Sequence, residues 1–559
     1  MALNLAQIDG IFAADRGFQL VGDLTTDESG IDPLGLRQLN LDLMDATVPG
    51  INNVTTRVRP YAFMAWAWWR SWELADADGS CDSRELADRV MRYEAMYAWG
   101  HDLAGRPLIG AAAIRRHLPR KGDDRPFRFE GKPWQVLKGD LTSIMAPTEY
   151  GPSIKATRWL RPVEGGAFRA TRETMSAVDA IEGIVSRHLP QRLFARESPE
   201  VTCADVLPFA QHLRIDEATQ EERDAFRTLF RDGADRQDAP RELKRRKASI
   251  DLVRAHLAEA GCPLSVPGIR RVLAKGALPV GCTDGDPETA VSVALLSVLQ
   301  ARQLQRLATE AMLLWTEANL EKDGIRARTS DQLASEADAE ARRDDALASA
   351  AATVGEYLDA VERLGLPKSW PAAAAEPDTD VVGLMEQLVL AQQKDRGVLP
   401  ALCLKSFAVV YAVSRGLRQQ GVPKAAGAPL DGRPDRLPFG ILEGQLDELR
   451  DRRLAYLWHR VIENWVIGQH VHWSAVRGGD GKKRLRIALD DRGWIRVRSH
   501  TSGGFHPTDD RLLTMLSLGS ECGLFTRTPL GFSASAMSAP VTEQIAASPA
   551  AQFAAAVAL

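Results

Sequence analysis

The sequence predicts a mainly α-helical, multidomain protein with small α+β inserts that resemble winged helices. Apolar residues recur at helical spacing along most of the chain, whereas strand-like features are confined to short stretches. The chain has 559 residues, more than a single hydrophobic core usually organises, so we expect about three or four domains. Because 45% of the residues are hydrophobic and 26% are charged, most of the chain is expected to fold.

Residues 1–138 are predicted to form a helical domain around a tryptophan-rich helix. Pro49-Gly50 ends one helical pattern, and Pro60 begins the next, at a position in a helix that favours proline. Spacings of three and four residues place four indoles on two adjoining stripes of this helix, so we expect core packing; a stacking platform for bases is the alternative. These residues are Trp66, Trp68, Trp69 and Trp72. Asp82 and Glu85 resemble a capping box for the following helix.

Residues 139–200 have the local order of a winged helix. A helix-like stretch precedes Gly165-Gly166, which can turn a short hairpin, and Thr171 then starts another helix. Many small α+β units share this order. The segment is therefore predicted to be a winged-helix-like insert.

Helical spacing returns in residues 201–370. Asp286 as N-cap and Pro287 in the first turn begin a helix that ends near Leu320 and is apolar on more than one face, so we expect it to be central and buried. The Ala-rich segment 330–352 is predicted to be an exposed helix. Residues 371–445 are predicted to hold a helical segment and a loop rich in proline and glycine.

Residues 446–534 are predicted to form a C-terminal domain. A long helix starts near Leu446, and strand-like alternation on both sides of the turn 490–493 then predicts a β-hairpin. Thr508 is expected to cap a last helix. The Ala/Ser-rich residues 535–559 are expected to be disordered.

No spacing in the sequence dictates a catalytic chemistry. It contains no GxxxxGK[ST] phosphate loop, no GxGxxG after a strand and no GxSxG elbow. Glu130-Gly131-Lys132 matches half of a metal-dependent endonuclease core, but the stretch before it is too short for the usual pair of strands. His459 and Glu463 share a helical face, whereas His470 lies roughly 10 Å further along, which favours interface histidines over metal ligands. We therefore assign no catalytic residues, no metal and no cofactor.

Basic residues on the C-terminal hairpin suggest contact with nucleic acid. The net charge is −4, so the whole molecule does not attract a polyanion, and any such contact needs a local basic patch. Arginines alternate with apolar residues along the hairpin, and a ribbon with one basic face can lie along phosphates; charges that guard an edge strand against aggregation look the same. The candidate nucleic-acid-binding residues are Lys482, Lys483, Arg484, Arg486, Arg492, Arg496 and Arg498.

The sequence predicts a cytoplasmic protein that does not cross a membrane. Its six cysteines are scattered without a CxxC pair, as suits a reducing compartment, and the N-terminus lacks the pattern of a secretory signal. We take residues 61–69 as the most apolar window, and it is far shorter than the ~20 residues that a bilayer requires.

Two segments of the chain carry a resemblance: the run DPLGLRQLNLDLMDATVPGINNVTTRVRPYAFMAWAWW, from Asp32 to Trp69, and the segment PTDDRLLTMLSLGSECGLF. The first is similar to the start, and the second to the last helix, of an uncharacterised group of bacterial proteins found among genes of phage defence and mobile elements. Together the segments cover about a tenth of the chain. The resemblance implies a setting among defence genes, and it attaches no catalytic residues.

These observations lead to one functional hypothesis and two alternatives. We expect a non-enzymatic component of a bacterial anti-phage defence or DNA-transaction complex, a helical scaffold that binds nucleic acid or proteins encoded by neighbouring genes. The alternatives are a metal-dependent nuclease whose acidic residues come from distant helices, and a pure protein-interaction scaffold.

Overall fold

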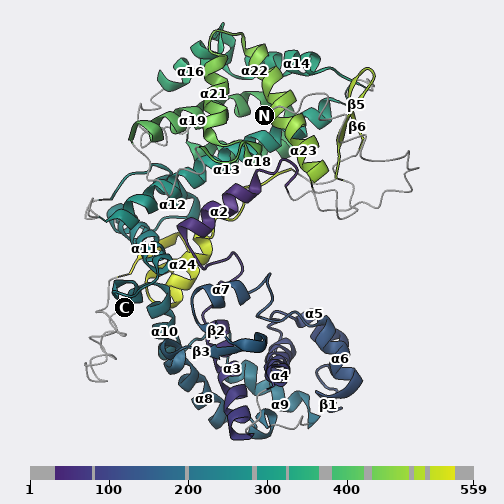
Figure 1. The fold of residues 1–559 in the computed structure, drawn as a ribbon, viewed down its shortest axis with the longest axis vertical. Helices are drawn as coiled ribbons and strands as arrows, with labels where there is room; N and C mark the ends of the chain where they lie inside the picture. Colours follow the sequence, from purple (N-terminus) through teal and green to yellow (C-terminus); the bar gives the residue numbers. More distant parts are fainter. Residues whose placement is uncertain are drawn as a thin grey trace. The chain divides into compact units, whose positions relative to one another are not determined.

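The computed structural model is mainly α-helical, as predicted (Figure 1). It describes residues 32–78, 82–195, 200–279, 286–320, 322, 327–363, 380–420, 431–476, 484–497 and 504–535. Within these ranges the strands pair only into two-stranded antiparallel sheets. The predicted disordered tail, 535–559, lies outside the described residues except for Ser535.

The chain forms two compact units, and each unit combines two separate stretches of sequence. Unit 1 consists of Met1–Ala46 and Pro267–Thr508, and unit 2 consists of Thr47–Val266 and Asp509–Leu559. Three of the predicted segments, 1–138, 201–370 and 446–534, therefore contain residues of both units. Local composition does not reveal such a discontinuous arrangement, because it arises from contacts between distant stretches.

Unit 1 is built around one long helix, α13 (Pro287–Asn319). As predicted, Asp286 is its N-cap, and the carboxylate accepts hydrogen bonds from the amides of Glu288 (3.3 Å) and Thr289 (3.1 Å). Nearly every residue of α13 from Val291 onward is buried, which confirms the predicted central helix. The other α-helices of unit 1 are α2 (Arg37–Thr47), which ends in unit 2, α12 (Val266–Ala274), α14 (Ser330–Asp344), α15 (Ala346–Ala350), α16 (Val354–Arg363), α18 (Val381–Lys394), α19 (Leu399–Gln420), α21 (Phe439–Glu448), α22 (Leu454–Arg460) and α23 (Gln469–Val476). The described part of unit 1 also contains the 3₁₀ helices η6 (Arg396–Val398) and η8 (Pro434–Arg436) and the π-helix η9 (Val461–Gly468).

Two sequence-based predictions for unit 1 are wrong. The segment 330–352 is not an exposed helix throughout, because Leu333, Ala337 and Ala341 of α14 are buried; small alanines on the packed face conceal its amphipathic character. The helix expected from Leu446 is also interrupted. Helix α21 ends at Glu448, and a new helix begins at Leu454 and continues through the π-helical turns of η9.

Helix α19 contains an apolar segment that the sequence analysis overlooked. Residues Arg396–Gln419 are long and apolar enough to span a membrane, with a mean hydropathy of 1.7. Most of the apolar window, 72%, is buried inside the protein. This burial is typical of a core helix.

Unit 2 has the tryptophan-rich helix, α3 (Arg59–Asp78), in its core. Trp66 is fully buried, and Trp68 and Trp72 are at most 9% exposed, which confirms the predicted core packing for these three indoles, whereas Trp69 is only partly buried. Asp82 caps the next helix by accepting from the Arg84 amide, as predicted, whereas Glu85 lies 3.5 Å from Arg89 and does not complete the expected capping box. The other α-helices of unit 2 are α4 (Ser83–Leu103), α5 (Ala111–His117), α6 (Gly131–Asp140), α7 (Gly151–Ala156), α8 (Met175–His188), α9 (Cys203–His212), α10 (Gln220–Phe230), α11 (Arg241–Ala260) and α24 (Leu512–Glu521). Its 3₁₀ helices are η1 (Glu164–Gly166), η2 (Arg172–Thr174), η3 (Gln191–Phe194) and η4 (Asp232–Asp235).

The hairpin predicted around Gly165-Gly166 is present in unit 2. Strands β2 (Leu160–Pro162) and β3 (Phe168–Ala170) pair antiparallel, and both glycines have the positive φ angles, 78° and 82°, that glycine adopts readily. Helices α7 and α8 flank the hairpin, so the helix–hairpin–helix order is confirmed. Classification of this segment as a winged helix stays a prediction.

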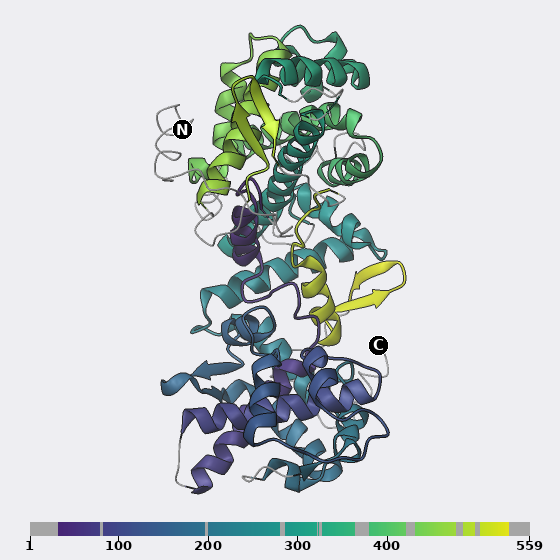
Figure 2. The same ribbon diagram turned by 90° about the vertical axis from the view of Figure 1, so that its right-hand side faces the viewer.

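The end of the described chain also belongs to unit 2. Strands β1 (Phe127–Arg128) and β4 (Glu200–Val201) form one short sheet, and β7 (Phe525–Thr528) and β8 (Gly531–Ala534) form a second hairpin, beside α24 in Figure 2. Thr508 does not cap the last helix: α24 begins at Leu512, whose amide donates to Asp510 (3.3 Å), after Arg511 at φ 61°. This turn, and not the threonine, sets the start of the helix.

Candidate nucleic-acid interface

The C-terminal hairpin of unit 1 forms as the sequence predicts. Strands β5 (Ile487–Asp490) and β6 (Gly493–Arg496) pair antiparallel, with Asp490 opposite Gly493, so the two residues between them make the turn. Gly493 has a φ of 133°, and a Cβ atom there would lie 2.6 Å from the backbone oxygen of Arg328. Only glycine fits this approach of two backbones.

The hairpin is fastened to the segment that enters α14. Arg328 and Trp494 exchange two backbone hydrogen bonds, of 3.0 and 2.8 Å, and so form an isolated antiparallel β-bridge beside the hairpin. The Trp494 indole donates to the hydroxyl of Ser330 (3.0 Å). The hairpin is consequently a fixed part of unit 1.

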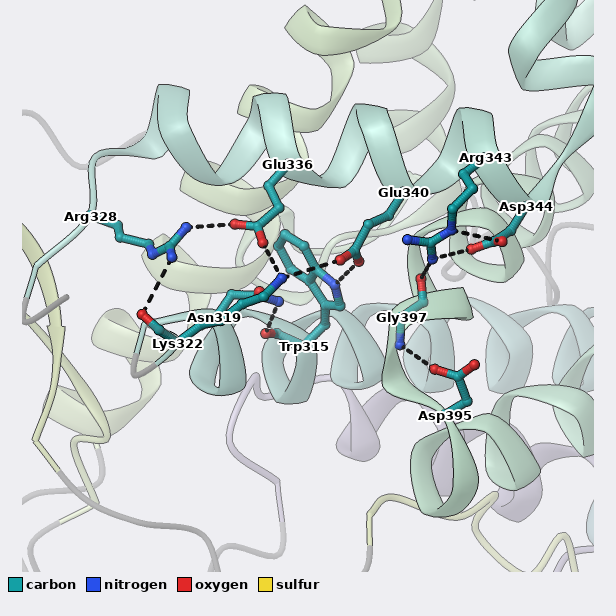
Figure 3. Close-up of polar contacts among 10 residues, drawn as sticks. All are labelled: Trp315, Asn319, Lys322, Arg328, Glu336, Glu340, Arg343, Asp344, Asp395 and Gly397. Atoms are coloured by element: carbon teal, nitrogen blue, oxygen red, sulfur yellow. Dashed lines mark hydrogen bonds and ion pairs between the residues drawn. The ribbon is translucent and has the colours of Figure 1, made fainter. Parts of the chain in front are cut away.

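A network of charged side chains holds Arg328 in place (Figure 3). Its guanidinium donates to Glu336 of α14 (2.6 Å), and Lys322 also pairs with Glu336. One turn further along α14, Glu340 accepts from the Trp315 indole of α13 (2.7 Å). Through these contacts the hairpin, α14 and the end of α13 form one connected structure.

Arg486 is buried, so the prediction that it stands on an exposed basic face is wrong. It is 7% exposed, and its guanidinium lies 3.5 Å from the carboxylate of Glu317 on α13. Burial raises the pKa of Glu317, and the positive charge of Arg486 opposes that rise. The regular alternation of the strand begins only at Ile487, so Arg486 turns inward and anchors the hairpin.

The remaining candidate residues have different positions. Arg492 is exposed in the turn, and Arg484 and Arg496 are partly exposed. Lys482, Lys483 and Arg498 lie outside the described residues. The structure thus brings three of the predicted contacts to the accessible surface of one hairpin.

His470 of α23 supports the base of the hairpin. Its Nε2 atom accepts from the Arg486 amide (2.9 Å), so the proton must reside on Nδ1, which faces the Pro33 carbonyl oxygen at 3.3 Å. Burial, together with the nearby Arg486 charge, lowers the pKa of His470 to about 4. Protonation of Nε2 would remove the acceptor for the Arg486 amide.

We expect acid to loosen the hairpin through His470. Between about pH 6.5 and 4 the unfolded state binds more protons than the folded state, so the stabilisation is complete above about pH 6.5 and is lost as the pH falls through about 4. By about pH 5 the contribution of His470 to the free energy of unfolding has fallen by about 2 kcal/mol. Hydrogen exchange of the segment 484–497, corrected for the intrinsic rate, measures this opening. His470→Gln should lose the pH dependence and His472→Gln should keep it; an unchanged pH dependence in His470→Gln would contradict the assignment.

Charged residues along α13 form a buried stripe that the sequence analysis missed. Arg302, Arg306, Glu310 and Glu317 are each at most 3% exposed. Arg302 donates to the Leu437 carbonyl (2.6 Å), and Arg306 lies 3.3 Å from Glu310. Burial lowers the pKa of Arg302 to about 9 and raises that of Glu310 to about 7. The sequence does contain a sign of this stripe, because the charged residues 302, 306 and 310 repeat at four-residue spacing in a helix that is predicted to be buried.

The residues considered for metal chemistry are engaged elsewhere. Glu130 lies 3.0 Å from Arg128, and Asp123 lies 2.7 Å from Arg125. His459 lies 3.1 Å from Glu463, as their shared helical face predicts. Across the residues that the structure describes, no group of three or more His, Cys, Asp or Glu side chains could hold a metal ion.

Comparisons with known proteins add no relative. No protein-family model, curated protein or solved structure matches the chain.

Proposed function

We propose that the protein is a non-enzymatic, cytoplasmic component of a bacterial anti-phage defence or DNA-transaction complex, in which a helical scaffold presents the β5–β6 hairpin to nucleic acid. One observation carries the proposal: the hairpin is fastened to unit 1 at its base, whereas Arg492 at its turn is exposed. A rigid two-stranded ribbon with arginines can lie along phosphates or enter a groove.

Charge supports a local contact. The chain as a whole carries −4, so binding depends on the hairpin and not on the overall field. Arg484, Arg492 and Arg496 supply three guanidinium groups, and the proposed interface also includes Lys482, Lys483 and Arg498. Three to six phosphate contacts correspond to a slope of about −3 to −5 when the logarithm of the binding constant is plotted against that of the salt concentration.

A second candidate function, binding of a partner protein, has its own supporting observation. Leu489 and Val497 of the same hairpin are 59% and 43% exposed. Large apolar side chains beside an exposed arginine are typical of protein interfaces. A protein encoded by a neighbouring gene is the partner that this alternative predicts.

We expect the variant Arg484→Gln/Arg492→Gln/Arg496→Gln to bind DNA at least tenfold more weakly than wild type in a mobility-shift assay at about 100 mM salt. The variant Arg363→Gln/Arg433→Gln/Arg453→Gln changes three exposed arginines elsewhere in unit 1 by the same charge, and it should bind like wild type. Equal loss in both triple variants would contradict a specific role of the hairpin. Mg²⁺-dependent cleavage of the DNA would favour the nuclease, and co-purification of a partner without DNA binding would favour the scaffold.

A further inference from the structure

The β2–β3 hairpin of unit 2 concentrates basic side chains that the sequence analysis did not assign. The hairpin lies beside α3 (Figure 1). Its strands and the residues that flank them carry five cations: Lys155, Arg158, Arg161, Arg169 and Arg172. The same stretch holds two acidic residues, and one of them, Glu173, lies 3.5 Å from Arg236 outside the hairpin.

Two of these arginines face each other across the hairpin. Arg161 and Arg169 are register partners, so their Cβ atoms are about 4.5–5.5 Å apart on the same face of the sheet. Like charges in directly opposite positions destabilise an antiparallel pair. Trp72 and Asp76 stabilise Arg169, whereas Arg161 has no acidic partner within the described ranges, so an anion bound beside the pair would relieve the remaining repulsion.

Aromatic contacts fix one side of this pair. The Arg169 guanidinium lies 3.9 Å above the ring of Trp72, whose indole donates to the Phe168 carbonyl (2.7 Å). Trp68 packs edge-on against the Phe168 ring. Arg169, which also lies 4.0 Å from the carboxylate of Asp76, is thereby held in position while 41% of its side chain stays exposed.

The other four cations have no acidic partner. Lys155, Arg158, Arg161 and Arg172 are exposed, and within the described ranges no carboxylate oxygen lies within 4.0 Å of their charged nitrogens. Several exposed arginines elsewhere in unit 2 are paired: Arg115 with Asp102, Arg125 with Asp123, and Arg128 with Glu130 and Glu200. The hairpin differs from these sites because its uncompensated cations lie together in one short stretch.

The backbone also keeps these cations together. Thr171 donates to the Arg158 carbonyl (2.9 Å), which joins the two ends of the hairpin next to Arg172. Arg158 has a φ of 62°, a conformation that costs an L-residue about 1 kcal/mol or more and favours glycine. The backbone conformation at this position does not favour arginine. A need for positive charge on this part of the surface would explain why arginine occurs there.

We infer that the β2–β3 hairpin is a second nucleic-acid-binding element, which contacts the phosphates of a DNA duplex. Uncompensated guanidinium groups at strand spacing match a row of phosphates, and Arg161 with Arg169 can hold one phosphate between them. The inference rests on the proposed nucleic-acid binding, and it assigns a role to a hairpin that this proposal does not use.

The test measures binding of the full chain to a fluorescein-labelled DNA duplex of about 30 base pairs between about 50 and 200 mM salt. Arg161→Gln/Arg172→Gln should weaken binding about tenfold or more at about 100 mM salt and reduce the salt slope by about 2. Arg125→Gln/Arg128→Gln removes the same charge from paired arginines of unit 2 and serves as the control.

The outcomes separate this inference from the proposed function. If Arg161→Gln/Arg172→Gln binds like wild type while the β5–β6 variant is weakened, the inference fails and the proposed function stands. If only the β2–β3 variant is weakened, the inference stands and the β5–β6 assignment fails. Equal weakening of the β2–β3 variant and its control would also overturn the inference, and absence of DNA binding by the wild-type chain at about 50 mM salt would overturn both.

Discussion

Arg59→Met is expected to destabilise unit 2 by about 3–5 kcal/mol, because it leaves a buried carboxylate without its partner. Arg59 and Glu222 are at most 1% exposed, and the Arg59 Nε atom lies 3.0 Å from the Glu222 carboxylate. Burial raises the pKa of Glu222 to about 6, and the Arg59 charge opposes that rise. Denaturant unfolding of wild type and variant measures the loss in free energy of unfolding.

A second substitution should rescue this variant. Glu222 also closes the capping box of α10, where it accepts from the Thr219 amide (2.7 Å), and glutamine can make the same bond. We therefore expect Arg59→Met/Glu222→Gln to recover most of the lost stability at neutral pH. If the double variant were no more stable than Arg59→Met, the loss would come from packing and not from the uncompensated charge.

Gly100→Ala is expected to destabilise unit 2 by about 1–3 kcal/mol, although alanine favours a helix interior. A Cβ atom on Gly100 of α4 would lie 2.1 Å from the backbone oxygen of Val206 on α9, so one helix must move. Neither a rotamer change nor a flexible side chain can relieve a clash with a carbonyl oxygen.

Gly139→Ala is the matched control for this effect. Gly139 is exposed in α6, and nothing lies within 4 Å of the position that its Cβ would take. Helix propensity alone then predicts a gain of about 0.5–1 kcal/mol. Thermal unfolding of both variants checks the opposite signs, and a stabilised Gly100→Ala variant would contradict the close approach of α4 and α9.

Local chemistry was sufficient to predict many elements. Asp286 with Pro287 gave the start of α13, Gly165-Gly166 gave the β2–β3 turn, and the alternation around residues 490–493 gave the C-terminal hairpin. In each case a residue with a strong backbone preference marks the end of a regular pattern.

The features that could not be predicted arise from contacts between residues that are distant in sequence. Arg57 pairs with Glu521 (2.8 Å), and Leu264 pairs its backbone with Phe532, so residues from the far end of the chain complete unit 2. Arg486 was predicted to be exposed because its buried partner, Glu317, is distant in sequence. The cations of the β2–β3 hairpin were visible in the sequence, but only the structure shows that Arg161 is the register partner of Arg169 and that Arg161 has no carboxylate within 4.0 Å among the described residues.

The decisive measurement is the salt dependence of DNA-duplex binding by the full-length wild-type chain. We expect binding to be measurable at about 50 mM salt and the binding constant to fall steeply, with a logarithmic slope of about −3 or steeper, as the salt concentration rises to about 200 mM. Binding that is absent at about 50 mM salt, or that does not change with salt, would contradict the proposed nucleic-acid binding.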